Sequence, residues 1–276
     1  MNLSQANILV EQALSAYQDK RFADAEELWA AAGKLCAEGD QWVGVASCYL
    51  NRGNSLANLG RFAEAVGEFD SAEPIFDHFK SDIGVAGCRI SRGDALANLR
   101  RFDEAISEFD GAEAIFAQYE EWNYVARSNL SRGDALANLG RFDEAIKNYD
   151  RAKSVADRCE LRDCAARSQL SRGIALRNLG RYEQSVADCE HAESIFATLN
   201  QWMGVSIARV NRGMALQNLV KNEEAMANYQ QARSIIFEIC QWSDVTRYQS
   251  DMGIALQHPR QYEHAVSHDL SAIMGS

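Results

Sequence analysis

Small and apolar residues recur at fixed positions every 40 residues along the chain. The segment 91–106 reads SRGDALANLRRFDEAI and the segment 131–146 reads SRGDALANLGRFDEAI, so two stretches 40 residues apart differ at one position. Self-similarity at a fixed period of this kind is the signature of a protein built from stacked repeats. Three columns run down the chain without an insertion, and they consist of Gly53, Gly93, Gly133, Gly173, Gly213 and Gly253, of Leu56, Leu96, Leu136, Leu176, Leu216 and Leu256, and of Ala32, Ala72, Ala112, Ala152, Ala192, Ala232 and Ala272.

Each repeat contains two runs of apolar residues with helical spacing. In the repeat 121–160, the run from Val125 to Leu139 predicts a first helix, helix A, and the run from Phe142 to Val155 predicts a second, helix B. We expect Gly140 to end helix A, because glycine adopts the left-handed conformation after a helix without strain. The chain has only 2 prolines, so its helices can run uninterrupted. The columns divide the chain into repeats of a single solenoid, at 1–40, 41–80, 81–120, 121–160, 161–200, 201–240 and the incomplete 241–276.

The glycine and alanine columns indicate close contacts between helices. Gly133 lies inside helix A, where glycine costs about 1 kcal/mol relative to alanine. Its recurrence predicts that helix B approaches closely at this point, with Ala145 and Ala152 as the small residues on the other side. No single repeat can bury its apolar face alone, so neighbouring repeats must stack. The pattern therefore predicts an all-α fold, a solenoid of about seven helix–turn–helix repeats.

These columns resemble the tetratricopeptide repeat (TPR) family over essentially the whole chain. The usual repeat of that family has about 34 residues, whereas this one has 40 and resembles the repeats of spindle-orientation adaptors and, more loosely, of kinesin light chains. It also lacks the closing proline and has arginine in place of the leucine before the glycine. The resemblance implies a right-handed superhelix whose concave groove, lined by the A helices, holds peptides or partner domains. The residues that carry it in one repeat are Gly133, Leu136, Gly140, Phe142, Ala145, Tyr149 and Ala152.

A polar stripe on helix A is the candidate binding site in such a groove. Arg127, Ser131, Asp134 and Asn138 step by 4, 3 and 4 residues, which places them on one helical face. Asparagine has donors and an acceptor, so a ladder of asparagines can bind an extended peptide backbone without reading its side chains. The alternative is structural, because asparagine near a helix end makes local hydrogen bonds and recent duplication copies residues whether or not they are used. The candidate residues are Asn51, Asn54, Asn58, Asp94, Asn98, Arg127, Ser131, Asp134, Asn138, Arg167, Asn178, Asn211, Met214 and Asn218.

Two further columns allow alternative interpretations. The arginine column has the chemistry of phosphate or carboxylate binding, but we expect its heads to pair with helix B carboxylates such as Asp70, Asp110 and Asp150. The tryptophan column, at the start of helix A, predicts a packing seam between repeats, with a binding anchor as the alternative. The two columns are Arg52, Arg92, Arg132, Arg172 and Arg212, and Trp42, Trp122, Trp202 and Trp242.

Charge and composition narrow the function. The net charge of −11 argues against a nucleic-acid partner, and residues 1–80, with 12 acidic and 6 basic side chains, should draw a cationic partner to the N-terminal half. No apolar stretch is long enough to span a membrane and no secretory signal is present, so we expect a cytoplasmic location. We expect no enzyme, cofactor or metal, because enzyme motifs are absent and the 7 cysteines lack the clustered spacing of zinc ligands.

The two ends of the chain depart from the pattern. Residues 3–19 fit helix A poorly, as expected of a capping repeat. Leu270, Ile273 and Met274 form an apolar C-terminal end without a polar cap, and we expect a second copy in a homodimer or a downstream domain to cover it. The sequence thus predicts a scaffold or adaptor that binds a protein or peptide. The alternative is a peptide-responsive sensor that acts on a signalling or transcription partner.

Overall fold

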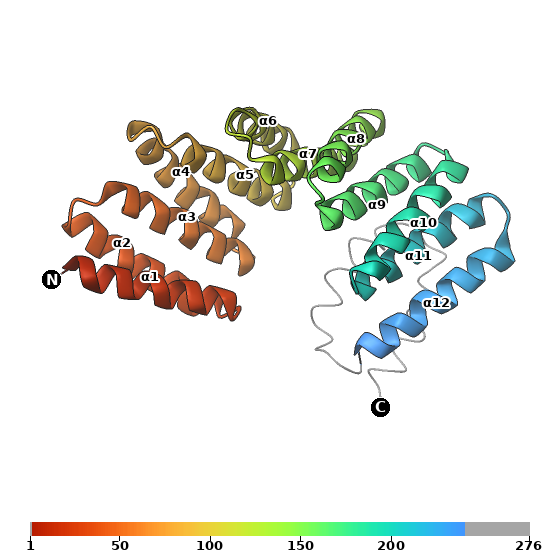
Figure 1. Cartoon of the computed structure of the whole chain (residues 1–276), viewed down its shortest axis with the longest axis horizontal. Helices are drawn as coiled ribbons and strands as arrows, with labels where there is room; N and C mark the ends of the chain where they lie inside the picture. Colours follow the sequence, from red (N-terminus) through yellow and green to blue (C-terminus); the bar gives the residue numbers. More distant parts are fainter. Residues whose placement is uncertain (1, 241–276) are drawn as a thin grey trace. The chain divides into compact units, whose positions relative to one another are not determined.

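The computed structural model describes residues 2–240, which form helices joined by short turns (Figure 1). Within this part of the chain no strand occurs, so the predicted all-α fold is confirmed. Odd-numbered helices are the A helices of the repeats, and even-numbered helices are the B helices. The seventh repeat, with Trp242 and the apolar C-terminal end, lies outside the described residues. The helices are α1 (Asn2–Gln18), α2 (Phe22–Glu38), α3 (Trp42–Asn58), α4 (Phe62–His78), α5 (Asp82–Asn98), α6 (Phe102–Gln118), α7 (Trp122–Asn138), α8 (Phe142–Arg158), α9 (Arg162–Asn178), α10 (Tyr182–Thr198), α11 (Trp202–Asn218) and α12 (Asn222–Cys240).

Each turn contains one residue in the left-handed conformation, and this residue recurs every 20 positions. Gly140 has φ +76°, as predicted, and the backbone N–H of Arg141 donates to the Leu136 carbonyl at 2.9 Å. This bond is part of the Schellman motif that ends a helix and satisfies its last carbonyls. Glu120, with φ 58°, adopts the same conformation without being glycine. The geometry of the repeat therefore imposes the left-handed conformation at this turn position. Glycine, which adopts it without steric strain, occupies the position only in some repeats.

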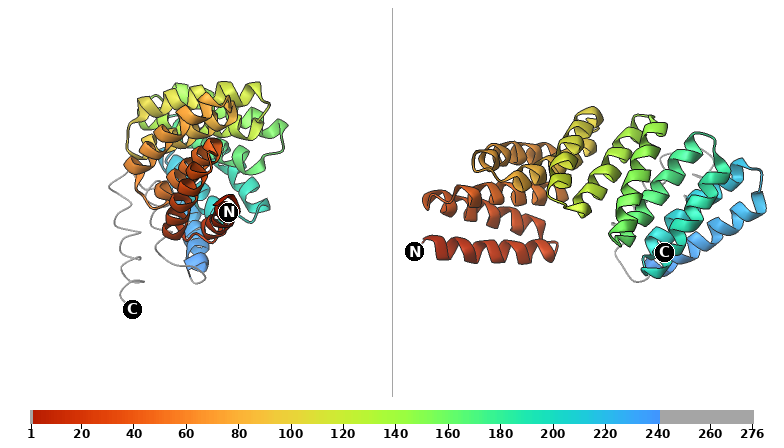
Figure 2. Two further views of the ribbon diagram at one scale, coloured as in Figure 1. Left: turned by 90° about the vertical axis from the view of Figure 1, so that its left-hand side faces the viewer. Right: turned by 45° about the horizontal axis from the view of Figure 1, so that its top comes forward.

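The chain divides into two compact parts, Met1–Ala175 and Leu176–Ser276, which we call the N-terminal part and the C-terminal part. In the N-terminal part each helix from α1 to α8 packs against the next, in a stack that follows chain order (Figures 1 and 2). Successive A helices also touch there, α3 with α5 and α5 with α7. In the C-terminal part α11 packs between α10 and α12. The prediction of one continuous domain over 1–276 stays a prediction.

The glycine column sits where an aromatic ring of helix B meets helix A. A β-carbon built on Gly133 would lie 2.6 Å from Cε1 of Tyr149, and one on Gly53 would lie 2.5 Å from Cε1 of Phe69. Ala145 and Ala152 on the opposing helix are completely buried. Gly133 thus leaves room for a large ring of helix B, which fills the space that a methyl group would need. The predicted role of Ala145 and Ala152 as the small residues that face it stays a prediction.

The arginine column pairs with carboxylates, as expected. Arg92 Nη1 lies 3.0 Å from Asp70 Oδ1, while its Nη2 lies 2.6 Å from Glu73 Oε2 and 2.7 Å from Glu108 Oε2. Arg132 pairs in the same way with Asp110, and Arg172 Nη1 lies 2.5 Å from Asp150 Oδ1. Arg92 is paired with carboxylates of both flanking B helices, α4 and α6, whereas Asp110 and Asp150 come from the B helix that precedes their arginine. Since the preceding B helix belongs to the preceding repeat, the column links neighbouring repeats. These ion pairs favour a structural role for the arginine column over the binding of a phosphate or carboxylate ligand.

Candidate functional site

The polar stripe predicted on helix A forms a continuous surface in the N-terminal part. We call it the A-face: the residues at positions 7, 11, 14 and 18 of the repeats on α3, α5 and α7, together with Arg167 and Ser171 of α9. The A helices of this part touch one another, so the stripes of neighbouring repeats lie side by side. Asn51, Asn54 and Ser131 are partly buried in this surface. Asn98, Arg127, Asn138 and Arg167 are exposed.

The asparagines at the end of each A helix make a local hydrogen bond and keep further capacity. Nδ2 of Asn98 donates to the Asp94 carbonyl and Nδ2 of Asn138 to the Asp134 carbonyl, both at 2.8 Å. Asn58 makes the equivalent bond to Asn54, and its Nδ2 also lies 2.9 Å from the hydroxyl of Tyr17. Within residues 2–240, Oδ1 of the exposed Asn98 and Asn138 has no hydrogen-bond partner. The structural interpretation therefore accounts for one N–H of each amide, and the carbonyl oxygen remains open to a ligand.

A ladder of charged groups crosses the A-face between repeats. Arg127 of α7 pairs with Asp94 of α5. One repeat further, Asp134 accepts a 2.8 Å hydrogen bond from the Tyr149 hydroxyl, is hydrogen-bonded to Ser171, and faces the charge of Arg167. Each acidic group thus meets an arginine from the next repeat. The ladder leaves this surface close to neutral.

The carboxyl group of Asp134 is enclosed by these neighbours, although the residue as a whole keeps some exposed surface. Burial raises its pKa from 3.8 to about 6, against the opposing effects of the Tyr149 hydroxyl, Arg167 and Ser171, and Asp94 adds to the rise. In the preceding repeat Phe109 stands where Tyr149 stands, so Asp94 has no such hydroxyl. Asp94 and Asp134 therefore lie in chemically different surroundings, although both repeats have aspartate at this position.

The C-terminal part does not present the predicted residues in the same way. Asn211 is 1% exposed and Met214 is 6% exposed, because Arg177 covers them. Arg177 Nη1 lies 2.8 Å from Asn211 Oδ1 and 2.6 Å from Met214 Sδ, and burial lowers the pKa of this guanidinium. Asn178 and Asn218 remain exposed. Asn211 and Met214 are thus buried between residues 176 and 240, and the prediction that the candidate residues of this part line a binding groove stays a prediction.

Sequence reasoning missed Arg177, although a signal was present. It occupies a column that is alanine in the three preceding repeats, at Ala57, Ala97 and Ala137. Arg177 thus places a long cationic side chain in a column of small residues. A change of this kind marks a position where one repeat differs from the others in packing or function.

The tryptophan column is less buried than a packing seam requires. The exposed fractions are 44% for Trp42, 39% for Trp122 and 49% for Trp202. Packing between repeats thus accounts for only part of each ring. The rest of each side chain is exposed.

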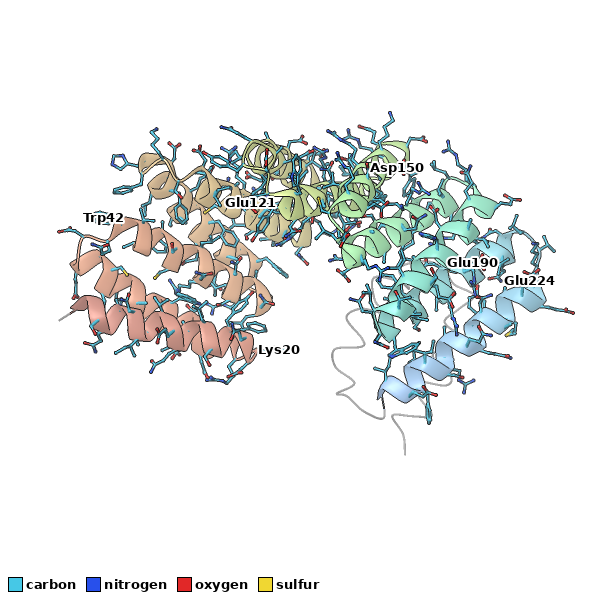
Figure 3. All side chains as sticks on the ribbon, viewed as in Figure 1. Lys20, Trp42, Glu121, Asp150, Glu190 and Glu224 are labelled. Atoms are coloured by element: carbon cyan, nitrogen blue, oxygen red, sulfur yellow. The ribbon has the colours of Figure 1, made fainter. Side chains whose placement is uncertain are left out.

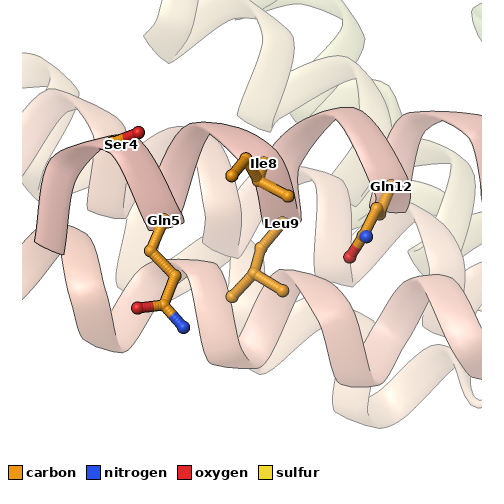
Figure 4. A pocket seen from close by; sticks show the side chains of 5 residues that line it. All are labelled: Ser4, Gln5, Ile8, Leu9 and Gln12. Atoms are coloured by element: carbon orange, nitrogen blue, oxygen red, sulfur yellow. The ribbon is translucent and has the colours of Figure 1, made fainter.

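At the N-terminus, the capping repeat buries one side of α1 through Ala6, Ala13 and Ala16. Its other side carries a shallow hollow lined by Ser4, Gln5, Ile8, Leu9 and Gln12 (Figure 4). Among residues 2–240, no three metal-binding side chains gather, and no helix is both long and apolar enough for a membrane span.

Comparison with known proteins finds a family model for part of the chain and solved structures of similar fold. A family model described as tetratricopeptide repeat matches residues 124–198. No curated protein matches the sequence. The crystal structure of the apo form of RapI is 14% identical, with 85% of either chain covered and a TM-score of 0.68.

Two further solved structures share the architecture. A Rap protein complexed with Competence and Sporulation Factor is 16% identical over 87% of this chain and 66% of that one, with a TM-score of 0.64. The TPR-like repeats of a kinesin light chain type protein from Podospora anserina are 18% identical over 71% of this chain and 96% of that one, with a TM-score of 0.58. Residues 124–198 thus match the tetratricopeptide repeat family, and most of the chain shares the fold of solved structures that include TPR-like repeats.

Proposed function

We propose that this protein is a scaffold that holds an extended segment of a partner protein along the A-face of its N-terminal part. The observation that carries the proposal is the pair of exposed asparagines, Asn98 and Asn138, on successive A helices. Each keeps an open Oδ1, which can accept a hydrogen bond from a main-chain N–H of the bound segment. The spacing by one repeat suits a ligand that runs across the helices.

The charge ladder favours recognition of the main chain of the bound segment over recognition of charges on its side chains. Asp94 is paired with Arg127, and Asp134 faces Arg167, so the A-face offers no excess of one sign. A ligand charge that entered this surface would have to break one of these pairs. Specificity along the A-face would thus come from shape and from the repeats that break the pattern.

Two solved structures of the same fold support a peptide ligand. One is the Rap protein complexed with Competence and Sporulation Factor, and another is YrrB, a TPR protein with an unusual peptide-binding site. YrrB is 17% identical to this chain, with a TM-score of 0.50. We propose that the present chain likewise binds a peptide or protein segment, that it has no catalytic activity, and that it is located in the cytoplasm.

Photo-crosslinking tests the proposal. A benzoylphenylalanine would be placed at Ser131 on the A-face in one variant and at the exposed Lys147 on helix B of the same repeat in a control. After incubation with cell extract, crosslinked segments would be identified by mass spectrometry. We expect one extended segment to be crosslinked from position 131 and not from 147. Equal crosslinking from both positions would reject the A-face as the binding surface.

The likeness to Rap proteins also supports a second candidate, a peptide-responsive sensor. A sensor should change its dimensions on binding, whereas a rigid scaffold should not. Small-angle scattering with and without the crosslinked segment, supplied as a synthetic peptide, separates the two. A fall in the radius of gyration on binding would favour the sensor.

A further inference from the structure

Exposed aromatic rings gather at one edge of the N-terminal part. Successive helices are antiparallel and joined by short turns, so all turns that lead from a helix B to the next helix A lie at the same edge, which we call the B–A edge. Large aromatic side chains on this edge are far from buried: Trp42 is 44% exposed, Phe79 46%, Tyr119 46% and Trp122 39%. Exposed aromatic rings are uncommon on a surface that has no partner, and they are enriched at interfaces.

The first repeat of this series has a hollow beside its tryptophan. It lies between the start of α3 and the end of α4 and is lined by Trp42, Pro74, Ile75, His78 and Phe79. Figure 3 labels Trp42 at this end of α3. The rings of His78 and Phe79 meet edge to face, with centroids 5.0 Å apart. The hollow is thus lined by three rings and by the apolar side chains of Pro74 and Ile75.

The next repeat is closed at the equivalent place. Asp82 replaces the tryptophan at the start of α5, and the Tyr119 hydroxyl donates a 2.6 Å hydrogen bond to its Oδ2. A tryptophan returns at Trp122, at the start of α7. The B–A edge therefore alternates between open aromatic rings and a hydrogen-bonded pair.

The same edge carries carboxylates that the protein does not neutralise. Asp40, Asp77, Glu120 and Glu121 are exposed and make no ion pair with any residue between 2 and 240. The opposite edge, where a helix A leads into a helix B, is different, because its arginines bind glutamates three residues ahead. Those pairs are Arg61–Glu64 at 2.6 Å, Arg101–Glu104 at 2.6 Å and Arg141–Glu144 at 2.7 Å.

We propose that the B–A edge of the N-terminal part binds a lysine- or arginine-containing segment of a partner protein, on a surface separate from the A-face. A cation placed over an aromatic ring is attracted by the ring, and tryptophan is the most favourable ring. The aliphatic stems of lysine and arginine cover apolar surface while their charged ends approach carboxylates. Asp77 adjoins the hollow at His78 in sequence, and Glu121 precedes Trp122, so both tryptophans have an unpaired carboxylate on the same edge.

A defined peptide tests this surface. The probe is a fluorescein-labelled peptide of four Lys-Leu-Gly units, with a peptide of four Glu-Leu-Gly units as its charge-reversed counterpart, measured by fluorescence anisotropy at low ionic strength. We expect the lysine peptide to bind and the glutamate peptide not to bind. Trp42→Ala combined with Trp122→Ala should weaken binding by up to about fivefold for each ring removed. Added salt should weaken binding to the wild-type protein.

The chain provides matched controls. Trp202 is 49% exposed at the start of α11, but the turn before it, Leu199-Asn200-Gln201, carries no charge, so Trp202→Ala should leave the affinity unchanged. Asp77→Asn combined with Glu121→Gln alters only exposed carboxylates and should weaken binding and reduce its dependence on salt, independently of any effect of the tryptophan changes on folding.

The proposal would be overturned by no binding of the lysine peptide, by equal binding of both peptides, or by unchanged affinity in both double variants. Asn98→Ala combined with Asn138→Ala removes the A-face asparagines and should not alter binding of the lysine peptide. Loss of binding in that variant would place the cationic segment on the A-face and would also overturn the proposal. Because this test uses a defined cationic peptide and variants of the B–A edge, its result stays interpretable even if no segment binds the A-face.

Discussion

Replacing Gly133 with alanine tests the close approach of helix B to helix A. The new β-carbon would lie 2.6, 2.8 and 3.1 Å from Cε1, Cδ1 and Cζ of Tyr149. The ring cannot move away freely, because Tyr149 is 2% exposed and its hydroxyl is bound to Asp134. Overpacking of this kind costs about 1–3 kcal/mol. Alanine also gains about 1 kcal/mol of helix propensity over glycine, so we expect Gly133→Ala to lower stability by about 0–2 kcal/mol.

A second glycine isolates the packing cost. Gly67 lies inside α4, and apart from the neighbouring backbone of its own helix nothing lies within 4 Å of a β-carbon built on it. Gly67→Ala should therefore stabilise the protein by up to about 1 kcal/mol. Since the propensity gain is common to both variants, the difference between them, about 1–3 kcal/mol, measures the overpacking alone.

Equilibrium urea unfolding, followed by far-ultraviolet circular dichroism, measures the difference. Repeat proteins do not always unfold in one step, so the slope of each transition must be compared with that of the wild type before midpoints are converted to free energies. Equal stability of Gly133→Ala and Gly67→Ala would refute the reasoning, because it would mean that the ring of Tyr149 moves aside without cost.

Further predictions concern a titrating group, a turn and a buried charge. Because the pKa of Asp134 is raised from 3.8 to about 6 in the folded protein, its contribution to stability is complete below pH 4 and is lost as pH rises through 6. Relative to the wild type, Asp134→Asn should thus gain about 1–2 kcal/mol between pH 4 and pH 7, once solvent screening is allowed for, and urea midpoints at the two pH values would show this. Val220 has φ 62° in the turn after α11, so Val220→Gly should raise stability by about 0.5–1 kcal/mol in thermal unfolding, and a lower melting temperature would contradict the strain argument. Arg177 is largely buried and makes no ion pair with any of residues 2–240, so Arg177→Met should stabilise the C-terminal part by about 1 kcal/mol, which proteolysis rates would report.

The sequence was most informative where the period alone decides the structure. The 40-residue columns predicted two helices per repeat and the end of helix A at Gly140, because both depend on backbone geometry that every repeat shares. They predicted small residues opposite Gly133, whereas the ring of Tyr149 lies there. The same logic did not reveal that Glu120 and Val220 adopt the conformation of Gly140. Their residue types oppose that conformation, and only the geometry of the repeat imposes it.

The repeat columns did not predict which side chains are exposed to solvent. Asn211 and Asn51 occupy the same column, yet Asn211 is 1% exposed because Arg177 reaches across from the neighbouring A helix. The direction of a long side chain depends on packing between repeats, which the spacing of residues does not encode. For the same reason the tryptophans were expected in a seam, whereas Trp42 keeps 44% of its surface exposed.

The central claim, that the A-face binds an extended segment, is tested most directly by titration calorimetry. The segment crosslinked from position 131 would be synthesised and titrated into the wild-type protein, into Asn98→Ala combined with Asn138→Ala, and into Lys147→Ala as a surface control on helix B. Each asparagine that accepts a main-chain hydrogen bond should contribute about 1 kcal/mol, or about fivefold in affinity. We predict a Kd about 25-fold higher for the asparagine double variant and unchanged for Lys147→Ala. Equal Kd values for all three proteins would contradict the account.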